Sequence, residues 1–234
     1  MTFKDLQRLI QKEQAITVTA ITEQENPRLS NLLQKLKNKP FWHWDTTKHK
    51  QKHKQTNGEC CFNHIIGLPR KDGIPKPLFD YERLIYDYLI TNNQRLLWVK
   101  KATGLGISEF MLRLMAWLCL KDNKLSGSQM IIVTGPNIDI AIKQIKRMKA
   151  LFQNPNKNKE NIFLTFSSKE TVLDLNGVHI EAFPSHHLDA ARALESPKFI
   201  LLDESDFFPI GQQQDARDVS ERYIAKSNPY IVMV

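Results

Sequence analysis

One stretch of this chain constrains its fold more than any other, because an apolar segment runs into a glycine-rich turn and then into a helical pattern. The stretch is Leu96-Leu97-Trp98-Val99-Lys100-Lys101-Ala102-Thr103-Gly104-Leu105-Gly106-Ile107-Ser108. A strand, a turn and a helix N-terminus in this order bring several backbone N–H groups to bear on one anion. The sequence therefore predicts a phosphate-binding loop at residues 101–108.

The loop departs from the usual pattern G-x-x-x-x-G-K-[ST] at the position of its lysine. Gly106 and Ser108 fit the pattern, but Ile107 stands where lysine is usual and Lys101 stands where the first glycine would be. A cation at the front of such a loop can fold back over the phosphates, so we interpret Lys101 as the relocated lysine. The residues predicted to contact nucleotide are Lys101, Ala102, Thr103, Gly104, Leu105, Gly106, Ile107 and Ser108.

A second motif lies further along the chain, where the apolar run Phe199-Ile200-Leu201-Leu202 ends in Asp203 and Glu204. Such a run is typical of a buried parallel strand whose C-terminal end delivers carboxylates to a site. It resembles a Walker B motif, in which Asp203 would hold Mg²⁺ and Glu204 would orient and deprotonate the attacking water. We expect this strand to lie beside the strand that precedes the phosphate-binding loop.

Each motif alone has a simpler explanation. Gly-x-Gly turns before helices are common, and a strand that ends in two acids is often only a strand that reaches the surface. The two motifs in this order and at this separation instead favour a domain that binds and hydrolyses a nucleotide.

Four motifs together resemble the ATPase domain of large terminase subunits, the motors that package viral DNA. The resemblance covers about residues 75–234, and some terminases carry such a deviant loop with its lysine at the front. The motifs are Lys101 to Ser108, Ile131-Ile132-Val133-Thr134-Gly135-Pro136, Ala191-Arg192-Ala193 and Leu202-Asp203-Glu204.

The resemblance implies a role for each of these positions. Lys101 would bind phosphate, Ser108 and Asp203 would hold Mg²⁺, and Glu204 would be the catalytic base. Arg192 would sense the γ-phosphate or contact DNA, although a surface arginine paired with a nearby acid explains it equally well. The implied cofactors are ATP and Mg²⁺, and the implied partner is double-stranded DNA. Motors of this family usually form rings, so a homo-oligomer, a small terminase subunit and a portal are candidate partners.

Two positions depart from the family's pattern. Many terminases and helicases read adenine with a Tyr-Gln pair, and the corresponding residues here are Tyr81 and Glu82. Glutamate accepts a hydrogen bond from the adenine amino group but cannot donate one to the ring, so base selectivity would be weak. Glu109 adds a negative charge one residue after Ser108, and we expect it to face away from the nucleotide.

The pattern of the remaining segments indicates an α/β fold. We predict a buried helix at 110–120, a strand at 130–133 and an amphipathic helix at 139–152 whose outer side carries Lys143, Lys146, Arg147 and Lys149. Asn176-Gly177 between two alternating runs predicts a β-hairpin, and residues 229–234 predict another strand. The fold class expected is a P-loop NTPase (RecA/ASCE-like) with a mostly parallel sheet flanked by helices, an antiparallel hairpin insertion and a small N-terminal helical appendage.

The chain of 234 residues is expected to contain two parts. Residues 1–74 form a basic appendage with helical patterns at 3–14 and 27–38, and residues 75–234 form the ATPase domain, which ends on a strand before any nuclease module. We therefore expect no nuclease activity. Neither a signal peptide nor a membrane span is recognisable. Three cysteines favour a reducing compartment, so we expect a cytoplasmic protein, in a host cell if the origin is viral.

The N-terminal part is rich in charge and in potential metal ligands. The formal net charge of +8 agrees with a DNA partner, yet the basic clusters at 35–39 and 48–54 are more simply solvated loops beside an apolar cluster. Five potential ligands fall between positions 49 and 64, namely His49, His53, Cys60, Cys61 and His64. Their spacing matches no well-known zinc finger, so zinc is not expected.

Two other functions stay open. A P-loop ATPase of helicase type would be stimulated by single strands rather than by duplex DNA. A non-catalytic nucleic-acid-binding protein would carry Ile107 as a mark of a decayed nucleotide site.

Overall fold

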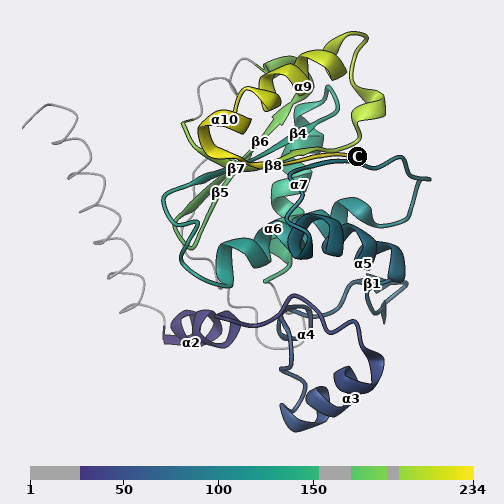
Figure 1. Ribbon diagram of the computed structural model, residues 1–234, viewed down its shortest axis with the longest axis vertical. Coiled ribbons are helices and arrows are strands. Elements are labelled where there is room, and N and C mark those ends of the chain that lie inside the picture. The colour runs from purple at the N-terminus through teal and green to yellow at the C-terminus, as the bar shows by residue number, and fades with distance from the viewer. Residues whose placement is uncertain (1–26, 153–169, 189–194) are drawn as a thin grey trace, which may run out of the picture.

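The computed structural model describes residues 27–152, 170–188 and 195–234. Its centre is a six-stranded sheet in which every neighbouring pair is parallel except β5 and β6 (Figure 1). The strands follow each other across the sheet in the order β3 (Leu96–Trp98), β8 (Tyr230–Met233), β7 (Pro197–Leu202), β4 (Gln129–Thr134), β6 (Val178–Pro184) and β5 (Val172–Leu175).

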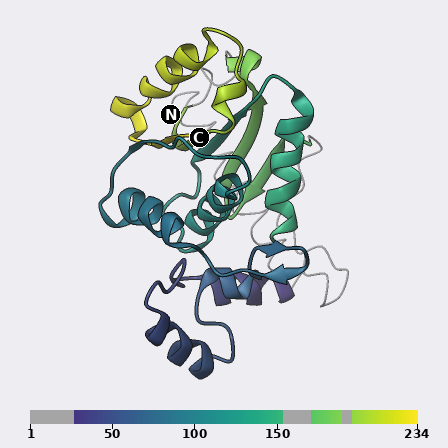
Figure 2. The ribbon, with the colours of Figure 1, turned by 90° about the vertical axis from the view of Figure 1, so that its right-hand side faces the viewer.

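Helices cover both faces of this sheet, which explains why its central strands are continuous apolar runs. α6 (Ile107–Leu120) and α7 (Ile138–Ala150) pack on one face, and α9 (Gln212–Glu221), followed by the short α10 (Ile224–Ser227), lies over the other (Figures 1 and 2). Along β7 the side chains alternate between the two apolar clusters, because successive strand residues point to opposite faces. The architecture is the RecA-like α/β fold expected from the sequence.

The expectation that the two motif strands lie side by side is wrong. β8 lies between β3 and β7, with Val232 paired to Leu97 on one side and to Leu201 on the other. The apolar pattern of residues 229–234 is enough to predict a strand, but strand order depends on pairing between distant segments and leaves no local signal. The C-terminal ends of β3 and β7 nevertheless lie at the same edge of the sheet, because all three strands are parallel.

The predicted hairpin is confirmed. β5 and β6 pair antiparallel up to Leu175 and Val178, so Asn176 and Gly177 form a two-residue turn with φ of 53° and 73°. Two successive positive φ angles are the requirement of a type I′ turn, which Asn-Gly meets with little strain. The Asn176 side chain also donates a hydrogen bond to the Cys119 carbonyl at 2.7 Å, which ties the turn to the end of α6.

The N-terminal elements lie beside α6, away from the sheet (Figure 1). They are α2 (Pro27–Leu36), α3 (Thr46–Gln55), α4 (Phe62–Ile65), the paired strands β1 (Arg70–Lys71) and β2 (Ile74–Pro75), α5 (Asp80–Tyr86) and the π-helical turn η1 (Asp87–Thr91). Phe41 and Phe62 are fully buried in the same apolar cluster as α6. Phe41 packs edge-on against Phe110 of α6, with ring centroids 5.5 Å apart.

Several predicted segments can now be placed. The helices expected at 27–38, 110–120 and 139–152 are present as α2, α6 and α7, whereas the expected helix at 3–14 lies outside the described residues. The division of the chain at residue 74 stays a prediction. In the part of the chain that the structure describes, no helix has both the length and the apolar character needed to cross a lipid bilayer.

Candidate nucleotide site

The predicted phosphate-binding loop leaves β3 and enters α6 at the edge of the sheet. Gly104 and Gly106 have φ of 83° and 78°, and Gly106 is the N-cap residue of α6. A Cβ atom added at either glycine would meet no atom within 4 Å, so backbone conformation and not crowding within the chain explains these glycines. The loop from Ala102 to Gly106 is exposed, so its backbone is open to a ligand.

Ser108 and Asp203 meet at the base of this loop although 95 positions separate them in the sequence. The Ser108 hydroxyl, in the first turn of α6, donates a hydrogen bond to Asp203 Oδ1 at 2.7 Å. Asp203 follows β7 directly, and its own N–H donates to the Val133 carbonyl of β4 at 2.8 Å. The fold thus brings a hydroxyl and a carboxylate from the two predicted motifs into direct contact.

Asp203 is fully buried, and its surroundings set its charge. Burial raises the pKa of Asp203 above its usual value, and the neighbouring Glu204 carboxylate adds to this rise. The Ser108 hydrogen bond and the positive charges of Lys101 and Arg147 lower the pKa of Asp203. Lys101, which is half-buried, therefore lies close enough for its ammonium charge to act on the carboxylate.

A second group of side chains holds the other oxygen of Asp203, and the sequence analysis missed it. Gln144 on α7 donates from Nε2 to Asp203 Oδ2 at 2.5 Å, and its Oε1 accepts from Arg147 at 3.0 Å. Arg147 also pairs with Glu109 at 3.3 Å. The placement of Arg147 on the outer side of α7 is therefore wrong, because its guanidinium turns inward to this network.

A signal for Gln144 was present in the sequence. Ala141, Ile145 and Met148 form the buried stripe of α7, and Gln144 occupies the same stripe at helical spacing. A glutamine at a core position is costly unless its amide is fully hydrogen-bonded, so such a residue indicates a buried polar partner.

Glu109 has its charge compensated within the protein. Its carboxylate pairs with Arg113 at 2.9 Å in addition to Arg147, and Arg113 is itself 5% exposed. Arg113 also donates to the Asn63 side chain and to the Gly67 carbonyl. The acid that the sequence placed next to the phosphate-binding loop therefore belongs to an ion-pair network between α6 and α7.

Glu204 adopts a backbone conformation that is unusual for its residue type. Its φ of 56° lies in the left-handed region, where six of the seven non-glycine residues of the described chain are Asn or Asp. Its neighbours are fixed, because Asp203 N–H binds Val133 O and Ser205 N–H binds Val234 O at 2.9 Å. Strain of this kind, held in place by surrounding hydrogen bonds, is common at functional sites.

Tyr81 and Glu82 are neighbours in the sequence, but Tyr81 contacts the phosphate-binding loop whereas Glu82 caps its own helix. The Tyr81 hydroxyl donates to the Leu105 carbonyl at 2.6 Å, which places this ring against the phosphate-binding loop. Glu82 is buried and caps its own helix by accepting from Phe79 N–H at 2.7 Å. Burial raises the pKa of Glu82 to about 7, against the lowering by that hydrogen bond and by Arg113.

The structure thus gathers Lys101, Ser108, Asp203 and Glu204 at one edge of the sheet, and Tyr81 contacts the same loop. Ile107, which stands where lysine is usual, is buried in the apolar core. Arg192 lies outside the described residues, as do the segments 153–169 and 189–194. The roles of all these residues stay predictions.

No model of a known protein family matches the chain, and no curated protein matches it. Among solved structures, the chain is similar to a chain from the S. cerevisiae complex of Dbp5 with Nup159, Gle1, IP6 and ADP, with 15% sequence identity and a TM-score of 0.41. The likeness covers 68% of this chain and 42% of that chain, so this chain spans less than half the length of its structural neighbour.

Proposed function

We propose that this chain is the Mg²⁺-dependent ATPase domain of a DNA-translocating motor of the large-terminase type. The observation that carries the proposal is the 2.7 Å contact between Ser108 and Asp203 at the C-terminal edge of a parallel sheet. Ligands of open α/β sheets bind at this edge, and the contact joins a helix N-terminus suited to phosphate with a carboxylate suited to a cation.

The loop from Lys101 to Ser108 would bind the phosphates. Gly104 and Gly106 let the backbone turn so that the N–H groups at the start of α6 stay available to an anion. Lys101 would supply the cation that Ile107 cannot, from the front of the loop. The lowering effect of the Lys101 charge on the pKa of Asp203 supports this role, because a charge acts strongly on a carboxylate only at short range.

Ser108 and Asp203 fit a magnesium ion, since a hydroxyl and a carboxylate oxygen are the hard ligands that Mg²⁺ prefers. A bound Mg²⁺ would neutralise charge that develops on the β- and γ-phosphates. Gln144 is a positioning residue in this scheme. By holding Oδ2 of Asp203 it leaves Oδ1 directed at Ser108.

Glu204 would orient the attacking water and accept its proton. The left-handed backbone at this position turns the chain sharply after β7, directly beyond the metal-binding carboxylate. Glu204 is half-buried and has a strained backbone conformation, and both features support its assignment as the general base.

The terminase-type assignment rests on the order of the sequence motifs and on the net charge of +8. A cationic protein attracts a DNA backbone through counterion release. The test is ATP hydrolysis measured with no DNA, with duplex DNA and with single-stranded DNA. Duplex stimulation supports the proposal, stimulation by single strands alone would assign the site to a helicase-type ATPase, and an absence of nucleotide binding would indicate a non-catalytic protein.

The neighbouring lysines Lys100 and Lys101 provide a matched pair for the front-lysine role. Lys101→Ala should lower kcat/KM for ATP by about a hundredfold or more, as expected for loss of a charged contact to the reacting phosphates. Lys100 is exposed, so Lys100→Ala should leave turnover close to that of the unmodified protein. Equal effects of the two substitutions would contradict the assignment of Lys101.

A further inference from the structure

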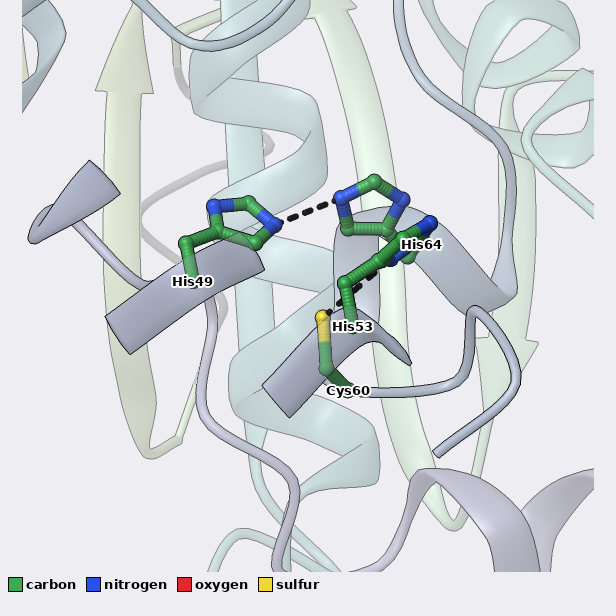
Figure 3. Close-up of side chains that lie close together, drawn as sticks. All are labelled: His49, His53, Cys60 and His64. Atoms are coloured by element: carbon green, nitrogen blue, oxygen red, sulfur yellow. Dashed lines mark hydrogen bonds between the residues drawn. The ribbon is translucent and has the colours of Figure 1, made fainter. Parts of the chain in front are cut away.

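Four potential metal ligands converge beside α3, far from the nucleotide site in the sequence. They are His49, His53, Cys60 and His64, and one ligand atom from each lies within 4.8 Å of every other (Figure 3). Cys60 Sγ is 3.7 Å from His53 Nδ1, and His49 Nε2 is 2.7 Å from His64 Nε2. A tetrahedral zinc ion with Zn–N of about 2.0–2.1 Å and Zn–S of about 2.3 Å separates its ligand atoms by about 3.3–3.6 Å, so small side-chain shifts would complete the shell.

The hydrogen bonds around the cluster prepare His49 to bind a metal. His49 Nδ1 lies 3.0 Å from the His43 carbonyl, which can only accept, so Nδ1 carries the proton and Nε2 presents its lone pair to the cluster. His43 uses its own Nε2 to donate to the Cys60 carbonyl at 3.1 Å. Backbone carbonyls that fix the ring orientation in this way are characteristic of metal-binding histidines.

The cluster is partly covered, since Cys60 is buried and the three histidines are half-buried. The Trp42 ring stacks on His64 with centroids 5.0 Å apart and meets His49 edge-on at 4.2 Å.

Apart from its N-cap, helix α3 is attached to the rest of the protein mainly through its histidines. It is ten residues long and buries none of them, and its side chains Lys48, Lys50, Lys52 and Lys54 are exposed. Lys48 and Lys52, like Lys50 and Lys54, are spaced so that their charges repel on the helix surface. A helix this short is marginal in water unless tertiary contacts support it, and the side chains that α3 turns inward are His49 and His53.

The other two ligands belong to a segment that is firmly attached to the core. Cys60 is 5% exposed, and the adjacent Phe62 and Asn63 are fully buried. Asn63 donates to the Phe41 carbonyl and accepts from Arg113. The cluster therefore joins a helix with no buried residue to an anchored segment, with two ligands from each side.

We propose that His49, His53, Cys60 and His64 bind one zinc ion that attaches α3 to the α4 segment. Imidazole and thiolate are ligands that zinc takes, and four protein ligands would close its tetrahedral shell and leave no position for a substrate, as in structural zinc sites. Cys61 is excluded from the shell, because the group of converging ligand atoms does not include its sulfur. This proposal is independent of nucleotide hydrolysis.

The direct test is metal analysis and cobalt substitution of the full chain. Purified protein should retain about one zinc per chain after dialysis, and Co²⁺ alone added to the metal-free protein should give the absorption of a tetrahedral site with a thiolate-to-cobalt band. Cys60→Ser should remove that band, whereas Cys119→Ala should keep it, because Cys119 lies in the core of α6. His49→Ala and His53→Ala should each lower zinc affinity tenfold or more, whereas the exposed His186→Ala should not.

Two results would overturn the proposal. The first is metal-free protein that binds neither Zn²⁺ nor Co²⁺ while its circular dichroism and melting temperature match those of the protein as purified. The second is a cobalt spectrum that survives Cys60→Ser but disappears in Cys61→Ala, since this would make Cys61 and not Cys60 the thiolate ligand.

Discussion

The nucleotide site and the histidine cluster are held in place by different forces. Ser108, Gln144 and Asp203 are buried between helices and a sheet whose apolar side chains fill two clusters, so their arrangement is part of the hydrophobic core. Helix α3 carries two members of the histidine cluster and buries no residue. The first site should therefore keep its geometry without a ligand, whereas the second should depend on its metal.

The largest effect that we expect is on ATP hydrolysis at the nucleotide site, which is the better packed of the two sites. Glu204→Gln keeps the shape of the side chain but removes the proton acceptor, so ATP turnover should fall by about 10²–10⁴-fold. Nucleotide binding measured by calorimetry should stay within a few-fold of the original, because the loop and Asp203 are unchanged. Turnover that survives this substitution would contradict the role of Glu204.

Glu195, which lies near Glu204 in the sequence, is a matched control acid. Glu195 is exposed and precedes β7 rather than following it. Glu195→Gln should therefore have no measurable effect on turnover. A similar loss in both variants would mean that general charge, and not the position of Glu204, controls the rate.

If α3 depends on a bound metal and the sheet does not, a chelator should destabilise α3 and leave the sheet unchanged. Removing metal with a chelator should make the backbone amides of α3 exchange with solvent roughly tenfold faster or more, because the helix loses its attachment. The amides of β4 and β7 should keep their protection, since apolar packing on both faces holds these strands. Hydrogen exchange followed by mass spectrometry measures both regions in one sample. Equal protection of α3 with and without metal would show that its stability has another source.

The buried carboxyl group of Glu82, beside the phosphate-binding loop, should make the free energy of unfolding depend on pH. Its folded-state pKa of about 7 exceeds the ordinary value of 4.5, so the folded protein holds a proton that the unfolded chain releases between these pH values. The free energy of unfolding should therefore fall as pH rises from 4.5 through 7, by up to roughly 3–4 kcal/mol at about 1.4 kcal/mol per pKa unit. Glu82→Gln should remove this slope in urea unfolding experiments at pH 5 and pH 8.

The exposed Asp80 on the same helix is the control for Glu82. Asp80→Asn should leave the slope unchanged, because the charge of an exposed carboxylate is nearly the same in the folded and unfolded states. A slope that persists in Glu82→Gln would place the buried proton on another group.

Local patterns were enough to predict much of the fold and part of the site. The apolar run ending in Asp203 and Glu204, the Asn176-Gly177 turn and the buried helix after the loop all depend on neighbours in the sequence, and the structure has each of them. The contact between Ser108 and Asp203 could be anticipated because both motifs point to one edge of a parallel sheet.

The features that sequence reasoning missed depend on contacts between distant segments. The insertion of β8 between β3 and β7 is a matter of strand order, and Gln144 becomes meaningful only when α7 packs against Asp203. The histidine cluster was judged by ligand spacing, which matched no familiar motif. The four ligands meet only because the chain reverses direction after α3. It does so at Asn57 and Gly58, which both have positive φ.

The smallest effect concerns the strain at Glu204. An L-residue other than Asn or Asp in the left-handed region costs about 1 kcal/mol or more, and Glu204 accepts this conformation between two neighbours fixed by backbone hydrogen bonds. Glu204→Asn places there the residue type that most other non-glycine left-handed positions of the described chain use, so it should raise the free energy of unfolding by about 0.5–1 kcal/mol while abolishing turnover. Glu195→Asn, outside any such conformation, should give no gain. A loss of stability in Glu204→Asn would show that the carboxylate makes contacts that outweigh the strain, and the left-handed turn would then be a structural feature rather than one retained for catalysis.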